Sequence, residues 1–276
     1  MIYSLSMSSP QIFQIFYDVE THKSLDPDFL PLDNLENSRP DWREYWPIRN
    51  FLLNNSLDEN SFYGFFSPKF KEKTGLSAKE CLIFIDQQAS DLDVITFSPL
   101  FDIGAWFQNT FLQAISQHPN ARESIDGALK LINPKFNVDE IVMHSGNIIY
   151  CNFFVAKPKF WREWLTTCEL IWAEAESGLS SVAQGLNSMA ENHDSPAAVK
   201  TFVIERIASL MLCTNSAWKI KTFNPFGLPF SDAPIASEVA ALIQMDALKM
   251  AYLQQQRPEY PELFKGLAKL VLQRVG

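Results

Sequence analysis

The chain has 276 residues, of which 47% are hydrophobic and 20% charged, so it can bury a sizeable core, and this composition argues against overall disorder. Its 32 acidic and 23 basic residues give a net charge of −9, which excludes a general attraction to nucleic acid or to an anionic membrane surface. The apolar runs are far shorter than the roughly 20 residues that a membrane span requires, and no basic segment precedes the first of them. We therefore expect no membrane span and a cytoplasmic location.

The first part of the chain alternates between predicted strands and helices. Ile12–Val19 is rich in β-branched and aromatic residues and predicts a buried strand. The polar, proline-containing segment from Thr21 to Trp42 predicts a long irregular loop. Aromatic residues up to Leu52 then indicate a short helix, and Phe62–Pro68 predicts a second strand.

The next elements continue this alternation. Ser77 and Glu80 have the spacing of a capping box and predict the start of a helix. Asp93–Pro99 is short and almost wholly apolar, as in a strand that is buried on both faces. Residues 105–118 predict one helix, and Ile148–Lys157 predicts a fourth strand.

Helices dominate the last part of the chain. Residues 159–177 and Lys200–Cys213 predict helices, and segment 182–200 between them predicts a loop. The aromatic stripe of the first of these helices favours a place in the core. Strands that alternate with helices indicate an α/β fold with a mainly parallel central sheet flanked by helices. We expect one domain over residues 1–276, with a helical C-terminal part at about 215–276.

Several common catalytic signatures are missing from the sequence. There is no G-x-G-x-x-G after the first strand, no G-x-x-x-x-G-K-[ST] and no G-x-S-x-G. The histidines show no H-x-x-x-H or H-E-x-x-H spacing, and the cysteines form no C-x-x-C pair, so a zinc site is disfavoured. An α/β enzyme with this sequence must bind its ligand by another route.

Two groups of carboxylates are candidates for the chemistry of a diphosphate. Asp91 and Asp93 form a D-x-D pair, whose oxygens suit a Mg²⁺ or Mn²⁺ ion that bridges phosphates. The alternative is that Asp91 only caps the turn before a strand. Asp102 follows the third strand and is the rival candidate, because ligands of open α/β sheets lie beyond the carboxyl ends of the strands.

Two further segments carry side chains suited to sugar and phosphate recognition. The segment from Asn37 to Tyr45 mixes guanidinium, carboxylate and aromatic groups, which can clamp phosphate and stack on apolar faces. The alternative is the exposed start of a helix. Four polar residues near the second strand form a local basic cluster that could meet a pyrophosphate, although a solvated loop is the alternative. They are Ser67, Lys69, Lys71 and Lys73.

The helix predicted for Lys200–Cys213 has charged residues in an apolar run. Glu205 and Arg206 lie on a narrow polar stripe opposite a broad apolar face. In one interpretation this stripe is the solvent-exposed side of a core helix. In the other it lines a cleft, where both groups are partly buried and have polar partners.

The order of these pieces resembles bacterial capsular and exopolysaccharide glycosyltransferases with a GT-A-type fold. One such family has N-x-x-x-x-x-x-E-L-x-x-x-Y-W and then G-L-x-H-Y-R-R, similar to NSRPDWREYWPIRN and YGFFSPKF here, although His-Tyr-Arg-Arg is missing. Its y-D-I-I strand, its helix with a histidine and its N-M-f-I-m-k strand resemble LDVITFSP, AWFQNTFLQAISQH and CNFFVAKPKFWREWL. Its g-F-L-x-E-R-L-l resembles KTFVIERIASLML, and the similarity spans about residues 12–215.

The resemblance implies transfer of a sugar from a nucleotide-sugar donor to a glycan acceptor in the synthesis of a surface polysaccharide. It places the Glu-Arg helix near the donor cleft, with Asp102, Glu205 and Arg206 as candidate catalytic residues and Asp91 and Asp93 as candidate ligands of Mn²⁺ or Mg²⁺. The candidate donor-binding residues are Tyr17, Asn37, Arg39, Asp41, Glu44, Ser67, Lys69 and Asn152. The missing His-Tyr-Arg-Arg favours an alternative, a GT-A-like domain without catalysis that binds other polysaccharide-assembly proteins.

Overall fold

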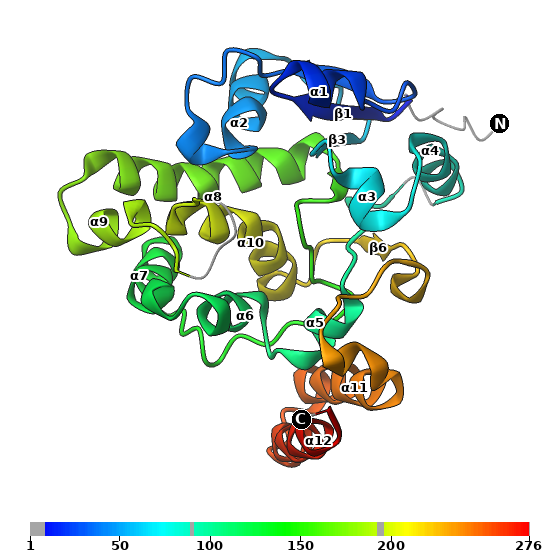
Figure 1. Ribbon diagram of the computed structural model, residues 1–276, viewed down its shortest axis with the longest axis vertical. Coiled ribbons are helices and arrows are strands. Elements are labelled where there is room, and N and C mark those ends of the chain that lie inside the picture. The colour runs from blue at the N-terminus through cyan, green and yellow to red at the C-terminus, as the bar shows by residue number, and fades with distance from the viewer. Residues whose placement is uncertain (1–8, 89–90, 192–195, 276) are drawn as a thin grey trace.

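The computed structural model describes residues 9–88, 91–191 and 196–275, which form an α/β fold (Figure 1). A mixed sheet has the strand order β2-β1-β3-β5-β4-β6. Its strands are β1 (Gln11–Phe16), β2 (Leu30–Asp33), β3 (Tyr63–Phe66), β4 (Val94–Thr96), β5 (Phe154–Ala156) and β6 (Ile220–Thr222). Three of the five neighbouring pairs are parallel, and the two antiparallel pairs both involve β5.

Helices cover both faces of this sheet. Those that position the candidate site are α2 (Tyr45–Asn54), α3 (Phe70–Thr74), α6 (Thr110–Gln117), α8 (Pro158–Ser177), α10 (Val199–Thr214) and the 3-10 helix η1 (Pro40–Trp42). The other α-helices of the described residues are α1 (Val19–Lys23), α4 (Ala78–Asp86), α5 (Phe101–Trp106), α7 (Arg122–Ile132), α9 (Ser181–Asn187), α11 (Val239–Gln255) and α12 (Glu259–Val275).

Successive side chains of the strands enter two separate apolar cores. Phe13 and Val94 pack toward α2, α8 and α10, whereas Ile12 and Ile95 pack toward α3 and α4. This division follows from the two-residue period of a strand, and it explains why the strands are apolar at consecutive positions. The aromatic stripe of α8 is confirmed as core, since Phe160, Trp161 and Trp164 are all buried. The sheet is therefore the middle layer of three.

Several predicted elements are confirmed. β3 and β4 lie within the predicted strand segments, and β1 begins one residue before its predicted segment and ends earlier, at Phe16. α8 and α10 match their predicted helices closely. The capping box of α4 is present, because Ser77 Oγ accepts from the Glu80 amide and a Glu80 carboxylate oxygen accepts from the Ser77 amide. The predicted strand Ile148–Lys157 is shorter, since only Phe154–Ala156 pairs with neighbours, and it runs in the reverse direction.

Other predictions were wrong in detail. The segment from Thr21 to Trp42, predicted as an irregular loop, contains the end of α1, β2 and η1, and β2 is an edge strand that tolerates Pro31. Segment 182–200 contains most of α9. The helix predicted for residues 105–118 is split into α5 and α6, because the Asn109 side chain accepts from the Leu112 amide and caps a new helix.

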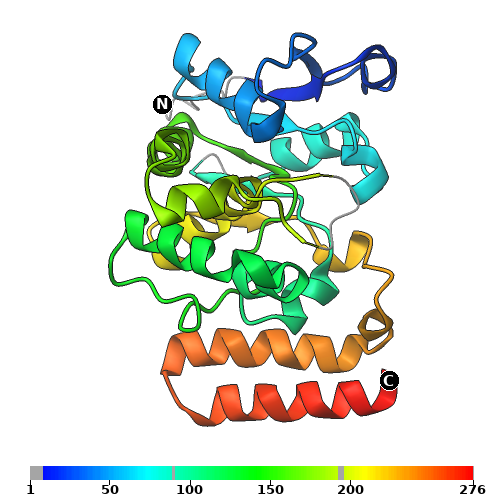
Figure 2. The same ribbon diagram turned by 60° about the vertical axis from the view of Figure 1, so that its left-hand side comes forward.

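The C-terminal part is helical as expected, apart from the edge strand β6. Helices α11 and α12 form an antiparallel hairpin, which lies as a separate layer at one end of the molecule (Figure 2). Small apolar clusters attach this hairpin to α5, with Leu242 against Phe101 and Ala105. The hairpin is thus joined to the segment that follows β4.

Candidate functional site

The strand order places a topological switch point between β1 and β3. From β1 the chain passes to β2 on one side, and later returns to place β3 on the other side, with both pairings parallel. Crossover connections leave a crevice beyond the carboxyl ends of strands at such a point, and ligands of open α/β sheets bind there. The candidate site is therefore the end of the sheet at which β1, β2 and β3 finish, at Phe16, Asp33 and Phe66. We call it the carboxyl edge.

A recess of about 280 Å³ opens at the carboxyl edge. Tyr17 follows β1, and Asn34 and Asn37 follow β2, so these strands carry three of the lining residues to one place. Arg43 and Glu44, between η1 and α2, form the opposite wall. The recess therefore joins three of the residues predicted for donor binding, because Tyr17, Asn37 and Glu44 all line it.

The backbone around the recess is held in unusual conformations. Asn37 has a φ angle of 40° and Arg43 a φ angle of 48°, both in the region that residues other than glycine rarely adopt. The side-chain amide of Asn34 donates from Nδ2 to Asn37 Oδ1 at 3.3 Å. Arg43 Nη2 donates to the carbonyl oxygen of Pro196 at 2.9 Å. Strained backbone of this kind is concentrated at functional sites, where the surrounding structure maintains it.

Glu205 of α10 faces the same charged region. Its carboxylate lies close enough to Arg206, Glu44, Lys73 and Arg43 for their charges to influence its pKa. Burial by surrounding atoms is the largest influence and raises this pKa above the ordinary value of 4.5. The side chain nevertheless keeps 40% of its surface exposed, so it is recessed rather than sealed. A recessed carboxylate with a raised pKa is suited to accept a proton from a ligand.

Besides Arg206, whose Nη1 lies 3.8 Å from Glu205 Oε2, Lys73 is a cation whose charge acts on this carboxylate. It lies in the last turn of α3, and its Nζ donates to Cys151 Sγ at 3.2 Å. Burial lowers the pKa of Lys73, but its contact with Cys151 and the charges of Glu205 and Glu44 outweigh burial and raise it. Burial is also the main reason that the pKa of the Cys151 thiol is raised. An ammonium and a carboxylate thus share this part of the carboxyl edge.

The turn before β5 adds buried polar atoms. Cys151 and Asn152 both have positive φ angles, 59° and 54°. Asn152 is 7% exposed, and within the described residues its Oδ1 and the Tyr150 hydroxyl have no hydrogen-bond partner. Buried polar atoms are usually paired, so two unpaired ones beside a strained turn indicate room for a water or a ligand. Asn152 is thus placed at the carboxyl edge, through which the reversed strand β5 enters the sheet.

Arg206 has its guanidinium in the core, and its Nη1 also lies 3.8 Å from Glu205 Oε2. Its guanidinium donates to the carbonyl oxygens of Thr110 and Phe202, each at 2.7 Å, and to Gln113 Oε1 at 2.6 Å. The side chain is buried, as the cleft interpretation required, but these partners belong to α6 and to its own helix. A position in a cleft predicts a donor phosphate or a neighbouring acid as a partner of Arg206, and Glu205 is such an acid. The hydrogen bonds of Arg206 to α6 place it in the frame that fixes α10, which carries Glu205.

Asp102 is also held by the protein itself. It is fully buried in the first turn of α5, and both carboxylate oxygens accept from the Ser231 amide, at 3.1 and 3.2 Å. The Ser231 hydroxyl donates to the same carboxylate. These bonds tie α5 to the loop before α11, so the geometry places Asp102 in the frame and not in the recess.

Asp91 and Asp93 lie at the amino end of β4, away from the carboxyl edge. Asp91 pairs with Lys219 Nζ at 2.7 Å, and Asp93 Oδ2 accepts from the Lys219 amide at 2.9 Å. These two carboxylates therefore do not fit a metal ion that bridges phosphates at the recess. Within residues 9–88, 91–191 and 196–275, no three His, Cys, Asp or Glu side chains are grouped so that they could share a metal ion.

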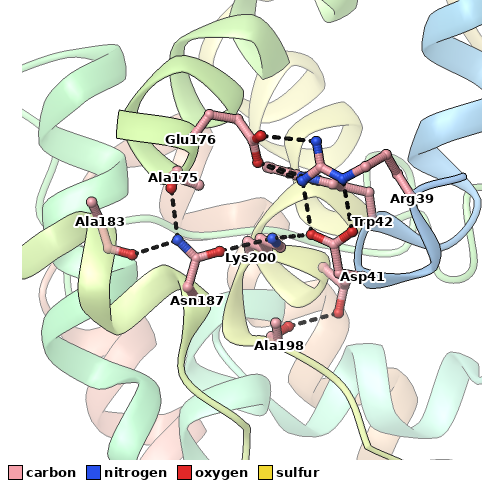
Figure 3. A network of polar contacts seen from close by, with 10 residues as sticks. Arg39, Asp41, Trp42, Ala175, Glu176, Ala183, Asn187, Ala198 and Lys200 are labelled. Carbon is pink, nitrogen blue, oxygen red and sulfur yellow. Dashed lines mark hydrogen bonds and ion pairs between the residues drawn. The ribbon is translucent and has the colours of Figure 1, made fainter. Parts of the chain in front are cut away.

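Arg39 and Asp41 belong to a polar network behind the recess (Figure 3). Arg39 donates to both oxygens of Glu176 on α8, at 2.8 and 2.6 Å, and to both oxygens of Asp41, at 3.0 Å each. Lys200 Nζ, only 2% exposed, donates to Asp41 Oδ2 at 2.6 Å and to Asn187 Oδ1 at 2.8 Å. Burial raises the pKa of Asp41, but these bonds outweigh it and lower the pKa to about 2.

The predicted Ser67 and Lys69 are not among the residues that line the recess. Lys69 is exposed just before α3, and the Ser67 carbonyl oxygen accepts from the side chain of Gln14. Lys73 follows Lys69 by four residues, and the charge of Glu205 contributes to raising its pKa. Arg43 was also absent from the predicted donor-binding set. The local sequence indicated both positions, because Arg43 adjoins the predicted Glu44 and Lys73 lies in the same basic segment as the predicted Lys69.

Searches of protein-family models, of curated proteins and of solved structures find no match to this chain. The helices in the described ranges include none that is long and apolar enough to cross a bilayer.

Proposed function

We propose that the chain is a glycosyltransferase that moves a sugar from a nucleotide-sugar donor to a glycan acceptor. The observation that carries this proposal is the recess at the carboxyl edge, where Tyr17, Arg43 and Glu44 form part of the lining. The charges of Arg43 and Glu44 also act on the carboxylate of Glu205. The sequence resemblance to polysaccharide glycosyltransferases supports the same function. The expected setting is the synthesis of a bacterial surface polysaccharide in the cytoplasm.

The side chains of the carboxyl edge can divide the work of such a transfer. Tyr17 is 39% exposed at the recess and offers a ring on which the base or the sugar of the donor can stack. Lys73 and Arg43 supply positive charge for the departing diphosphate, which gains negative charge as the bond to the sugar breaks. Glu205 accepts the proton of the acceptor hydroxyl, whose oxygen forms the new bond to the sugar carbon.

A ligand panel tests this function directly. Purified protein would be titrated calorimetrically with uridine, guanosine, cytidine and thymidine nucleotide sugars, with added Mn²⁺ and with a chelator, and release of free nucleotide would be followed. We expect one donor to bind and to be turned over slowly in water. Glu205→Gln should abolish turnover but keep binding, whereas Glu123→Gln, an exposed acid on α7, should change neither. If no donor binds, the proposal fails.

A second candidate is a binding or scaffolding subunit of a polysaccharide assembly without catalysis. It is favoured by the apolar surface of the C-terminal hairpin, where Leu263, Leu270 and Leu272 are 57%, 50% and 55% exposed. The same assay separates the two candidates. Binding of a nucleotide sugar with no turnover under any metal condition, in wild type and Glu205→Gln alike, would favour the scaffold.

A further inference from the structure

A large cavity lies away from the carboxyl edge. It has a volume of about 570 Å³ and lies between the C-terminal hairpin and the loop at residues 133–143. None of its lining residues belongs to the recess or to the Glu205 cluster. The volume is within the range of about 300–1,000 Å³ that is typical of small-molecule sites. We call it the hairpin cavity.

One wall of the hairpin cavity is aromatic and the other is polar. Tyr252 of α11, and Tyr260 and Phe264 of α12, are half-buried rings on the hairpin side. Glu140, Asp139 and Gln108 lie on the side of the body. Rings with one face covered and one face open are the groups that stack on the apolar faces of pyranoses, and acidic and amide oxygens accept from sugar hydroxyls. The two walls therefore suit the two kinds of surface that a sugar presents.

The walls are fixed by bonds within the protein. Lys249 Nζ donates to the carbonyl oxygens of Gly104 and Phe107, at 2.5 and 3.0 Å, and so anchors α11 to the end of α5. The side-chain amide of Gln108 donates from Nε2 to the carbonyl oxygens of Asp139 and Ile141, at 2.7 and 3.1 Å. These bonds hold the loop at residues 133–143 against the segment that follows α5. A cavity whose walls are already in place costs a ligand little ordering.

The charge of the hairpin cavity also limits its ligand. Asp139 and Glu140 are balanced by Lys249 and Lys265, so the lining has no excess of positive charge for a phosphate. Asp139 also forms an ion pair with Arg122. The cavity lacks the converging cations of the carboxyl edge, so a nucleotide sugar is disfavoured as its ligand and an uncharged polyhydroxylated chain is favoured.

We propose that the hairpin cavity binds a neutral oligosaccharide. Tyr252, Tyr260 and Phe264 stack on its rings, and Glu140 accepts from its hydroxyl groups. This site is independent of the proposed transfer reaction, since it shares no residue with the carboxyl edge. It would hold a glycan chain on the protein whether or not the chain is extended there.

Calorimetric titration with maltohexaose, cellohexaose and laminarihexaose tests the proposal, with a heparin hexasaccharide as the anionic probe. We expect at least one neutral chain to bind and the heparin fragment not to bind. Tyr252→Ala should weaken binding about tenfold or more, through loss of about 1.4 kcal/mol of stacking. Tyr252→Phe, which keeps the ring, should bind within about threefold of wild type and also guards against misfolding. Tyr17→Ala at the carboxyl edge should bind these chains as wild type does.

Several results would overturn the hairpin site. Failure of all three neutral chains to bind would do so, as would equal binding by wild type and a folded Tyr252→Ala protein. Loss of glycan binding in Tyr17→Ala alone would assign the glycan to the carboxyl edge. Because nucleotide-sugar binding is measured separately, failure of the hairpin site and failure of the transferase proposal can be told apart.

Discussion

The ammonium of Lys73 lies 3.2 Å from the sulfur of Cys151, and this contact joins α3 to the turn before β5. The two residues are far apart in the sequence, and they meet because β3 and β5 are neighbours in the sheet. Cys151 is the main influence that raises the pKa of Lys73, and the charge of Glu205 adds to it. The predictions below start from this cluster.

Lys73→Ala should weaken binding of the nucleotide-sugar donor about tenfold or more. A hydrogen bond to a charged phosphate contributes about 1.5–3 kcal/mol, and the alanine cannot supply one. Titration calorimetry of wild type and variant measures the difference. Lys71→Ala is the matched control, because Lys71 is exposed on the same short helix, and it should bind the donor as wild type does. Equal affinity in the Lys73 and Lys71 variants would remove Lys73 from the site.

Glu205→Gln should make the protein more stable than wild type at pH 7. The folded protein has a raised pKa at Glu205, so this group contributes stability below its unfolded pKa near 4.5 that is lost as the pH rises through the folded pKa. A neutral glutamine avoids that loss. Urea unfolding of both proteins at pH 7 and at pH 4 measures their free energies of unfolding, and the difference between them should be smaller at pH 4. A wild type that is more stable than the variant at pH 7 would contradict the cost of charging Glu205.

Arg206→Ala should destabilise the fold by about 3–5 kcal/mol, because it leaves three buried acceptors of α6 and α10 without their donor. Arg206→Lys should also destabilise, since an ammonium cannot reproduce the fork of the guanidinium. Denaturant unfolding measures both. Arg162→Ala is the control, because Arg162 pairs with Glu59 on the surface and its loss should cost less than about 1 kcal/mol. Similar small losses at both positions would refute a structural role for Arg206.

Lys200→Met should cost about 2–3 kcal/mol of folding free energy. The methionine keeps much of the buried stem but leaves Asp41 and Asn187 without the ammonium that bridges them. The variant should also raise the pKa of the Asp41 carboxyl, which nuclear magnetic resonance can follow. Lys219→Ala, which removes an exposed partner of Asp91, should leave the stability unchanged. An unchanged Asp41 pKa in Lys200→Met would show that the network does not depend on this lysine.

Much of the local structure was predictable from the sequence. The capping box before α4, the long amphipathic α8 and the apolar strands β1, β3 and β4 are each determined by neighbouring residues and their spacing. The edge strands β2 and β6 were not recognised. Both are short, partly exposed edge strands that lack the apolar run of the buried β3 and β4, so pairing with a neighbour decides their conformation.

The candidate site was only partly predictable. Tyr17, Asn37 and Glu44 were chosen from local composition and do meet at one recess. Glu205 and Arg206 are adjacent and were treated alike. The Glu205 side chain is 40% exposed, whereas the Arg206 side chain is buried and bonded to α6. A step of about 100° around a helix separates their directions, and the sequence does not show what lies on each side.

The sequence by itself determined an α/β chain with buried strands, an acidic surface charge and a helical C-terminal part. Only the tertiary structure decided that β5 runs in reverse, that β1 and β3 flank the switch point, and that Lys73 contacts Cys151. Local spacing encodes which face of an element is apolar. Pairing and packing between segments that are distant in the sequence decide which elements become neighbours. These long-range contacts are what bring the functional groups together.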